Sequence, residues 1–166
     1  SLDQFKGKIE GELEIASSSV PERFLLPNII LKFSKLYSKV KYNIKKYDTD
    51  IVINKILSGE IDFGIVGAKK TSKHLNYIDI LSDEIIVIAP NTREYKDIEY
   101  ISLEDIYKYP LIMRENGSAT KNIVLERLKQ NSININNLNM LAIIESSETI
   151  IELVKNNLGI SFISKY

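Results

Sequence analysis

Small polar side chains occupy three seams at which a strand-like run of the sequence is followed by a helix-like run. A helix N-terminus presents unpaired backbone N–H groups and a partial positive charge, so a hydroxyl placed there suits a small anion. The residues are Ser17, Ser18 and Ser19 at the first seam, Asn116, Gly117, Ser118 and Thr120 at the second, and Ser146 and Ser147 at the third. Their spacing makes anion binding the first chemistry to consider.

The same serines also have a purely structural explanation. Serine is a preferred N-cap residue, because its side-chain oxygen accepts a hydrogen bond from a backbone N–H in the first turn of a helix. For a single seam the cap is the simpler explanation, and only the three seams together favour a binding site. The sequence therefore leaves both interpretations open.

Other polar residues offer weaker candidates for chemistry. His74, the single histidine, lies in the polar segment "KTSKHLN" and is expected to face solvent, because a catalytic or metal-binding role would need partners at defined spacing. The acidic residues at 48–50 and 79–84 are typical of helix caps and surfaces. Arg114 and Glu115 leave two possibilities: they face a binding site, or they pair with each other.

Composition excludes several classes of function. The chain has 166 residues, 44% of them hydrophobic, which is enough for one domain or two small lobes with a real core. Lysine plus arginine equals aspartate plus glutamate at 22 each, so this chain is a poor candidate for contacting nucleic acid itself. Cysteine is absent, which excludes disulfides and thiolate metal sites and fits a reducing cytoplasm.

The ends and the apolar runs set further expectations. No apolar run is long enough to cross a bilayer, and the segment "SLDQFKGKIEGE" at 1–12 lacks the apolar core of a signal peptide. The chain opens without Met, so we expect it to be part of something longer. We predict no cofactor, no metal and no contact with a membrane.

Strand-like and helix-like runs alternate along the chain. Alternating apolar residues predict strands near 13–15 and 40–44. Further strands are predicted from the apolar runs at 63–68, 84–90, 110–113, 138–145 and 160–164. The segment 90–100 is expected to be a polar loop. Helices are predicted over 26–37, 51–57 and 120–130, the last with Ile123, Val124 and Leu128 inward, and after Ser147. This alternation favours a mostly parallel α/β sheet, in which ligands bind beyond the carboxyl ends of the strands.

The order of several segments resembles the effector-binding domain of LysR-type transcriptional regulators across nearly the whole chain. These segments are "GELEIASSS", "ILSGEIDFGIVGA", "LSDEIIVIAPN", "SLEDIYKYPLIMRENGSAT" and "ESSETIIELVKNNLGISFIS". The turn "RENGSAT" is similar to the family pattern Arg-Glu-Pro-Gly-Ser-Gly-Thr, with Asn116 in place of Pro and Ala119 in place of Gly.

The resemblance implies a two-lobed α/β fold like that of type 2 periplasmic binding proteins, in which each lobe is a mostly parallel sheet flanked by helices. It implies the end of a linker helix at 1–7, lobe one at 8–81, lobe two at 82–164, and the start of a return to lobe one at 165–166. Family members add further strands and a helix to lobe one, so the C-terminal part of lobe one is expected to be missing here. A small-molecule effector is expected in the cleft between the lobes.

The family's effector contacts fall on hydroxyl, amide and glycine positions of this chain. These positions are Ser18, Ser19, Gly67 and Ala68 in lobe one and Asn116, Gly117, Ser118 and Thr120 in lobe two, and we include Ser17 as the neighbour of Ser18. The implied function is sensing of a small organic acid or oxyanion without catalysis, in a homodimer or homotetramer. DNA would be bound only through a winged helix-turn-helix that this chain does not contain.

Two alternatives share the fold. One is a solute-binding protein of a transporter, and the other is a small-molecule enzyme. The Thr-Arg-Phe signature of prephenate dehydratases meets only Thr92 and Arg93, with Glu94 in the place of Phe. The enzyme is therefore the weaker alternative.

Overall fold

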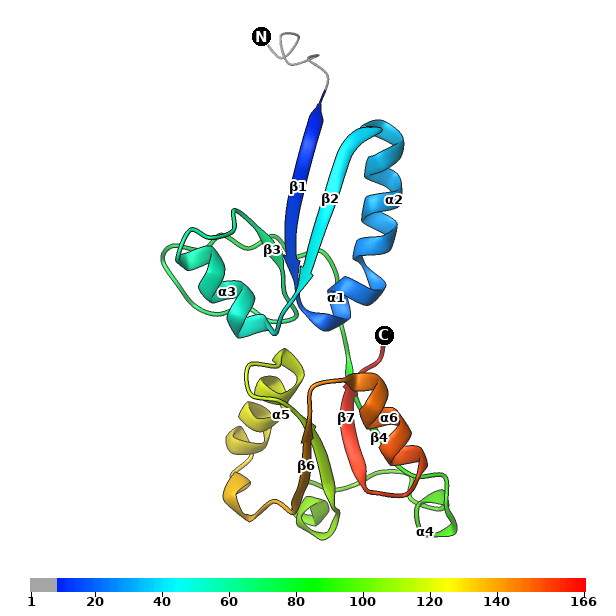
Figure 1. The fold of residues 1–166 in the computed structure, drawn as a ribbon. Coiled ribbons are helices and arrows are strands. Elements are labelled where there is room, and N and C mark those ends of the chain that lie inside the picture. The colour runs from blue at the N-terminus through cyan, green and yellow to red at the C-terminus, as the bar shows by residue number, and fades with distance from the viewer. Residues whose placement is uncertain (1–8) are drawn as a thin grey trace. The chain divides into compact units, whose positions relative to one another are not determined.

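The computed structural model describes residues 9–166, and these fall into two compact units, one ending at Ile78 and one formed by Asp79–Tyr166 (Figure 1). The sequence places the lobe boundary after Leu81, and the predicted linker-helix end at 1–7 lies outside the described residues. Within 9–166, no helix has both the length and the apolar character needed to cross a membrane.

Unit one is built on a three-stranded parallel sheet with the order β2-β1-β3. Its elements are β1 (Glu10–Ser17), α1 (Ser19–Phe24), α2 (Leu26–Leu36), β2 (Lys39–Lys46), α3 (Thr49–Leu57) and β3 (Gly64–Ile65). The strand predicted over 63–68 is shorter than expected. A Cβ on Gly64 would lie 2.6 Å from Val52 Cγ1 and 3.0 Å from the Ala16 carbonyl oxygen. The close packing of β3 against α3 and β1 at this position therefore requires glycine.

The sheet of unit one is covered on both faces. Ile15 and Ala16 are consecutive in β1, so their side chains face opposite sides, and both are buried. Ala16 packs with Val52 of α3, whose start is capped by the Asp48 carboxylate 2.7 Å from the Ile51 backbone nitrogen. The α2 helix contacts β2 through Phe33, whose ring centroid lies 6.5 Å from that of Tyr42 in an edge-on contact.

Unit two contains a four-stranded sheet with the order β4-β7-β5-β6, in which β4 is antiparallel to β7 and the other pairs are parallel. Its elements are β4 (Ile85–Ile88), α4 (Arg93–Lys96), η2 (Glu104–Lys108), β5 (Leu111–Arg114), α5 (Ala119–Gln130), η3 (Ile135–Asn137), β6 (Met140–Ile144), α6 (Ser147–Lys155) and β7 (Ile160–Ser164). The predicted mostly parallel α/β class is confirmed. The segment 90–100, expected to be a loop, contains the short helix α4.

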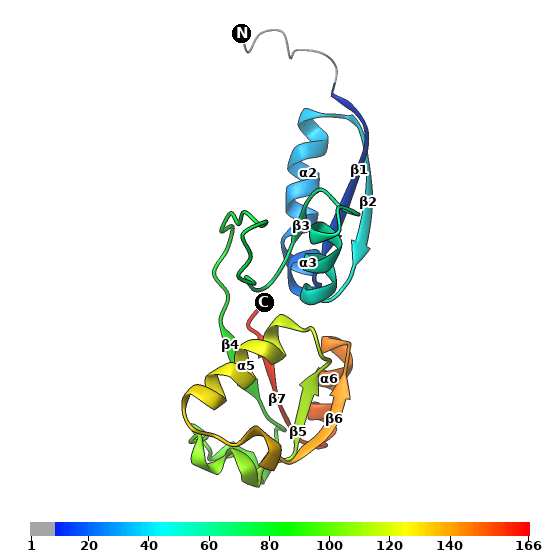
Figure 2. The same ribbon diagram turned by 90° about the vertical axis from the view of Figure 1, so that its left-hand side faces the viewer.

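Alternate residues of β5 supply two separate cores. Leu111 and Met113 pack with Val124 and Leu128 of α5 on one face, whereas Ile112 packs with α6 on the other. Figure 2, viewed with Figure 1, shows α5 and α6 on opposite sides of this sheet. The expectation that Ile123 points inward is wrong, because 42% of its surface is exposed.

The amino ends of β5 and β7 meet in a contact that leaves no room for a side chain. The Ile160 backbone nitrogen donates to the Pro110 carbonyl oxygen at 2.9 Å. A Cβ on Gly159 would lie only 2.4 Å from the same oxygen. Glycine at position 159 is therefore required for the entry into β7.

Candidate functional site

Two of the seams lie together at one edge of the sheet in unit two. The strands β5 and β6 are adjacent and parallel, so their carboxyl ends, from which α5 and α6 begin, share an edge. A direct contact joins them, because Arg114 Nη1 at the end of β5 lies 2.9 Å from Ser147 Oγ in the first turn of α6. The predicted residues at 116–120 are thus brought next to the third seam.

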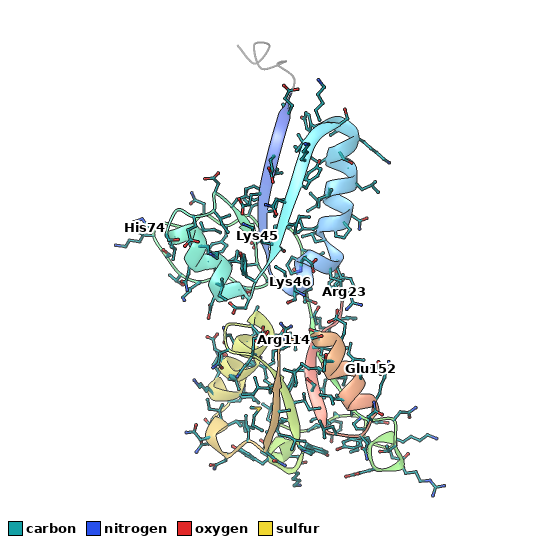
Figure 3. All side chains as sticks on the ribbon, in the orientation of Figure 1. Arg23, Lys45, Lys46, His74, Arg114 and Glu152 are labelled. Carbon is teal, nitrogen blue, oxygen red and sulfur yellow. The ribbon has the colours of Figure 1, made fainter. Side chains whose placement is uncertain are left out.

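Arg114 resolves one question that the sequence left open. Its guanidinium binds both carboxylate oxygens of Glu115, with Nε 2.8 Å from Oε2 and Nη2 2.9 Å from Oε1. Only 6% of the Arg114 surface is exposed, and Figure 3 shows the side chain at the end of β5. The two residues pair with each other, and this bidentate pair holds the loop that leads into α5.

Ser146 is a helix cap. Its hydroxyl oxygen accepts a hydrogen bond from the Thr149 backbone nitrogen at 3.2 Å and lies 3.0 Å from Glu148 Oε2, to which the hydroxyl donates. Both bonds lie within the first turn of α6. The structural explanation of the serines is therefore the correct one at the third seam.

Ser118 takes the same N-cap position at α5 but does not cap the helix with its side chain. Its backbone N–H donates to the Glu115 carbonyl at 3.3 Å, and its carbonyl accepts from Asn122, whereas its hydroxyl has no hydrogen-bond partner among the described residues. Only 4% of Ser118 is exposed. Gly117 adopts φ +91°, a left-handed conformation that favours glycine and turns the chain into the helix. Ser118 is therefore a buried residue at a helix N-terminus whose hydroxyl makes no cap bond.

Lys121, in the first turn of α5, was not predicted as a site residue. Its surface is only 6% exposed, and Nζ donates to Asn116 Oδ1 at 2.8 Å. Lys121, Val124 and Leu128 are spaced three and four residues apart, so they share the buried face of α5. That spacing was the available signal, but a lysine on an apolar stripe is not normally expected inside a protein.

The three serines of the first seam, in unit one, differ in their contacts, and the side chain of Ser17 is bound to backbone carbonyls. Ser17 is fully buried, and its Oγ lies 3.2 Å from the Ser18 carbonyl oxygen and 3.3 Å from that of Ile65. Ser18 is the buried N-cap of α1, and no side-chain cap bond forms there, while its backbone N–H donates to Ile65 O at 2.9 Å. Ser19 is half-buried at the start of α1.

The other lobe-one candidates follow β3 at the same edge. β1 and β3 are parallel, with Ser17 opposite Ile65, so Gly67 and Ala68 leave the sheet near the end of β1. Lys46, labelled in Figure 3, is opposite Ser17 in the other neighbouring strand and adds an exposed cation at this edge that sequence reasoning did not include. His74 is exposed, on the long segment that follows β3.

Comparison with known proteins identifies the class to which this arrangement belongs. The family model for the LysR substrate binding domain matches residues 6–166, and the chain belongs to this family. The solved effector binding domain of QuiR in complex with shikimate superposes with a TM-score of 0.82 at 16% identity, covering 94% of this chain and 74% of that one. The regulatory domain of CcmR from Synechocystis PCC6803 in complex with 2-PG superposes with a TM-score of 0.80 at 22% identity, covering 94% and 73%. The fold is therefore that of type 2 periplasmic binding proteins, as predicted.

The chain matches only part of the length of its curated relatives. A probable RuBisCO transcriptional regulator from Emiliania huxleyi is 26% identical over 167 residues, covering 99% of this chain and 53% of that protein. A phosphonates import ATP-binding protein, PhnC, from Anaeromyxobacter dehalogenans is 30% identical over 164 residues, covering 93% of this chain and 31% of that protein. The chain thus spans about half the length of the regulator that it matches and a smaller part of the import protein.

Proposed function

We propose that this chain is the ligand-sensing part of a LysR-type bacterial transcription regulator and that it binds a small anionic effector. The observation that carries the proposal is Ser118, a buried N-cap residue whose hydroxyl makes no cap bond. A helix start with free N–H donors and a free hydroxyl suits a carboxylate or another oxyanion. The two structural neighbours solved in complex with shikimate and with 2-PG support a small acidic ligand.

The proposed effector contacts are the predicted ones. Family membership supports placing the effector against loops of both lobes. The contact residues in this chain would be Ser18, Ser19, Gly67 and Ala68 in lobe one and Asn116, Gly117, Ser118 and Thr120 in lobe two. Ser17 would hold the backbone behind the lobe-one residues. Sensing needs no reaction: an effector that binds one arrangement of the lobes more tightly shifts the population towards it. DNA is bound by the winged helix-turn-helix of the full-length regulator, in a cytoplasmic homodimer or homotetramer.

A thermal-shift screen tests this function. The chain is screened against organic acids, including shikimate, and against 2-PG and inorganic oxyanions. A ligand at a hundredfold excess over its dissociation constant adds about 2.7 kcal/mol to the free energy of unfolding and raises the melting temperature by several degrees. A folded sample that responds to none of these compounds contradicts the proposal.

Variants then locate the effector within the chain. Ser18→Ala and Thr120→Ala should each weaken binding of the compound found by about 0.5–1.5 kcal/mol per neutral hydrogen bond lost. Ser146→Ala is the matched control, because it removes a serine at a neighbouring helix start whose hydroxyl is already used as a cap. Unchanged affinity in both test variants would show that these loops do not hold the effector.

A further inference from the structure

The ammonium of Lys121 is buried in unit two without an anionic partner. Its Nζ donates to the neutral amide oxygen of Asn116, and among the described residues no carboxylate lies within ion-pair distance of it. An ammonium carries three donors, so this contact leaves two without an acceptor of opposite charge. Burying a charge without a counter-charge is costly, and proteins normally pair it.

The nearest carboxylate along the chain does not serve as the counter-charge. Glu115 has both oxygens bound to Arg114, so that pair neutralises itself. No acidic residue occupies the first turn of α5, which begins with free N–H groups and a partial positive charge. Only 4% of the Ser118 surface is exposed, and its hydroxyl has no hydrogen-bond partner among the described residues. Two buried residues, Lys121 and Ser118, therefore carry donors that lack the acceptor that an anion would supply.

We propose that Lys121, Ser118 and the first N–H groups of α5 form a receptor for one compact oxyanion group, a carboxylate or a phosphate, and that Lys121 makes negative charge a requirement for binding. This inference rests on the proposed function and specifies which group of the effector lobe two recognises. A neutral isostere is rejected, because it leaves the buried ammonium unpaired. The bond to Asn116 holds Nζ at the loop that precedes the helix, so the receptor is preorganised.

The test is an NMR titration of the 166-residue chain with head-group probes, following assigned backbone amide signals at constant ionic strength. The probes are acetate, inorganic phosphate and acetamide, the last being the uncharged isostere of acetate. Wild type is compared with Lys121→Met, Lys121→Arg and the matched control Lys129→Met, which removes an exposed lysine from the same helix. Lys121→Gln provides a second charge-free variant if Lys121→Met does not fold.

We expect saturable shifts of the Ser118, Thr120 and Lys121 amides with acetate or phosphate and none with acetamide. The tighter of the two anions identifies the head group as carboxylate or phosphate. The charge-free variants should bind it at least about tenfold more weakly, since hydrogen bonds to charged groups contribute more than neutral ones. Lys121→Arg and Lys129→Met should retain binding within a few-fold.

Three results would overturn the inference: equal anion affinity in wild type and a charge-free variant, acetamide binding as tightly as acetate, or no saturable response of the α5 amides to either anion. The proposed function survives each of these results if the thermal-shift screen finds an effector whose binding is weakened by Ser18→Ala or Thr120→Ala. Conversely, a saturable anion response at α5 that depends on Lys121, with no effector found in the screen, supports the receptor and contradicts the wider proposal.

Discussion

The starts of α5 and α6 differ although both follow neighbouring parallel strands and both have serine at the N-cap. The backbone is extended at both serines, with φ −64° and ψ 129° at Ser118 and φ −93° and ψ 122° at Ser146. Only Ser146 uses its hydroxyl as a cap. Glu148 accepts a hydrogen bond from that hydroxyl, which leaves the oxygen lone pairs to face the Thr149 N–H. The first turn of α5 contains no acid that could do the same.

The comparison teaches that the residue type at an N-cap does not decide between structure and binding. The decision depends on the neighbours that orient the hydroxyl. Around Ser146 an acid fills that role, whereas the corresponding turn after Ser118 contains Thr120 and the buried Lys121. The Ser146 hydroxyl is satisfied within its own helix start, whereas we propose that the start of α5 is completed by a bound anion.

The largest effect is expected from cutting the link between the two helix starts. Arg114→Met leaves the Glu115 carboxylate and the Ser147 hydroxyl without their partner, and breaking a buried ion pair on one side costs about 3 kcal/mol or more. Urea denaturation measures this loss, with the exposed Arg127→Met on α5 as the control. An equal loss in both variants would mean that the two starts are not coupled through Arg114.

A pair of serine variants breaks the comparison directly. Ser146→Ala should lower the free energy of unfolding by about 1 kcal/mol, the usual cost of removing a cap. Ser118→Ala should lower it by less than half as much, because no cap bond is lost. Chemical denaturation of both variants under one set of conditions decides the matter, and equal losses would show that Ser118 caps α5 in solution.

Lys121→Met sharpens the electrostatic side of the comparison. Removing a buried charge that no carboxylate balances should raise the free energy of unfolding by about 0.5 kcal/mol or more, as replacing buried ionic groups by apolar ones often does. The melting temperature measures the gain, and Lys129→Met should leave it unchanged. A clear loss of stability in Lys121→Met would assign the lysine a structural role.

The smallest effect concerns a third serine that precedes a helical segment, Ser102 before η2. Its hydroxyl oxygen accepts from the Asp105 backbone nitrogen at 3.2 Å, and hydrogen bonds from Lys108 and then from Ser102 hold the pKa of the Asp105 carboxyl below its usual range. A carboxyl whose pKa is lowered by folding contributes stability above its unfolded pKa, and this is lost as the pH falls through the folded pKa. Asp105→Asn should therefore lower the melting temperature slightly at neutral pH and not in acid. A difference that persists in acid would exclude titration of Asp105 as its source.

The alternation of apolar runs was sufficient to predict the class of fold and the position of each seam. It failed where packing overrode the pattern of residue types. On α5, Ile123 was expected inside together with Val124 and Leu128, but the buried stripe through Val124 and Leu128 continues to Lys121 instead. The close approach of Gly64 in β3 to Val52 in α3 is another contact between segments that no local pattern contains.

The candidate site was predictable only as a set of loops. Serine, asparagine and glycine at strand ends indicated where a ligand could bind, but the use of each hydroxyl depends on contacts made across the fold. Ser17 is bound to a carbonyl of β3, and Ser147 accepts from Arg114 of β5, a strand earlier in the chain. Single-sequence spacing does not encode such pairings.

The contact between Gly159 and Pro110 has a consequence for how such a domain can change. It fixes the amino ends of β5 and β7 by close steric fit and by the hydrogen bond from Ile160 to Pro110, at the edge opposite the loops that carry Ser118 and Ser146. If these loops hold the effector as proposed, substitutions in them alter which small molecule is recognised without disturbing the strand alignment, whereas a single added methyl group at Gly159 forces the strands apart. Mutational tolerance is thereby concentrated at one rim of the sheet, and a new specificity can arise there while the architecture is retained.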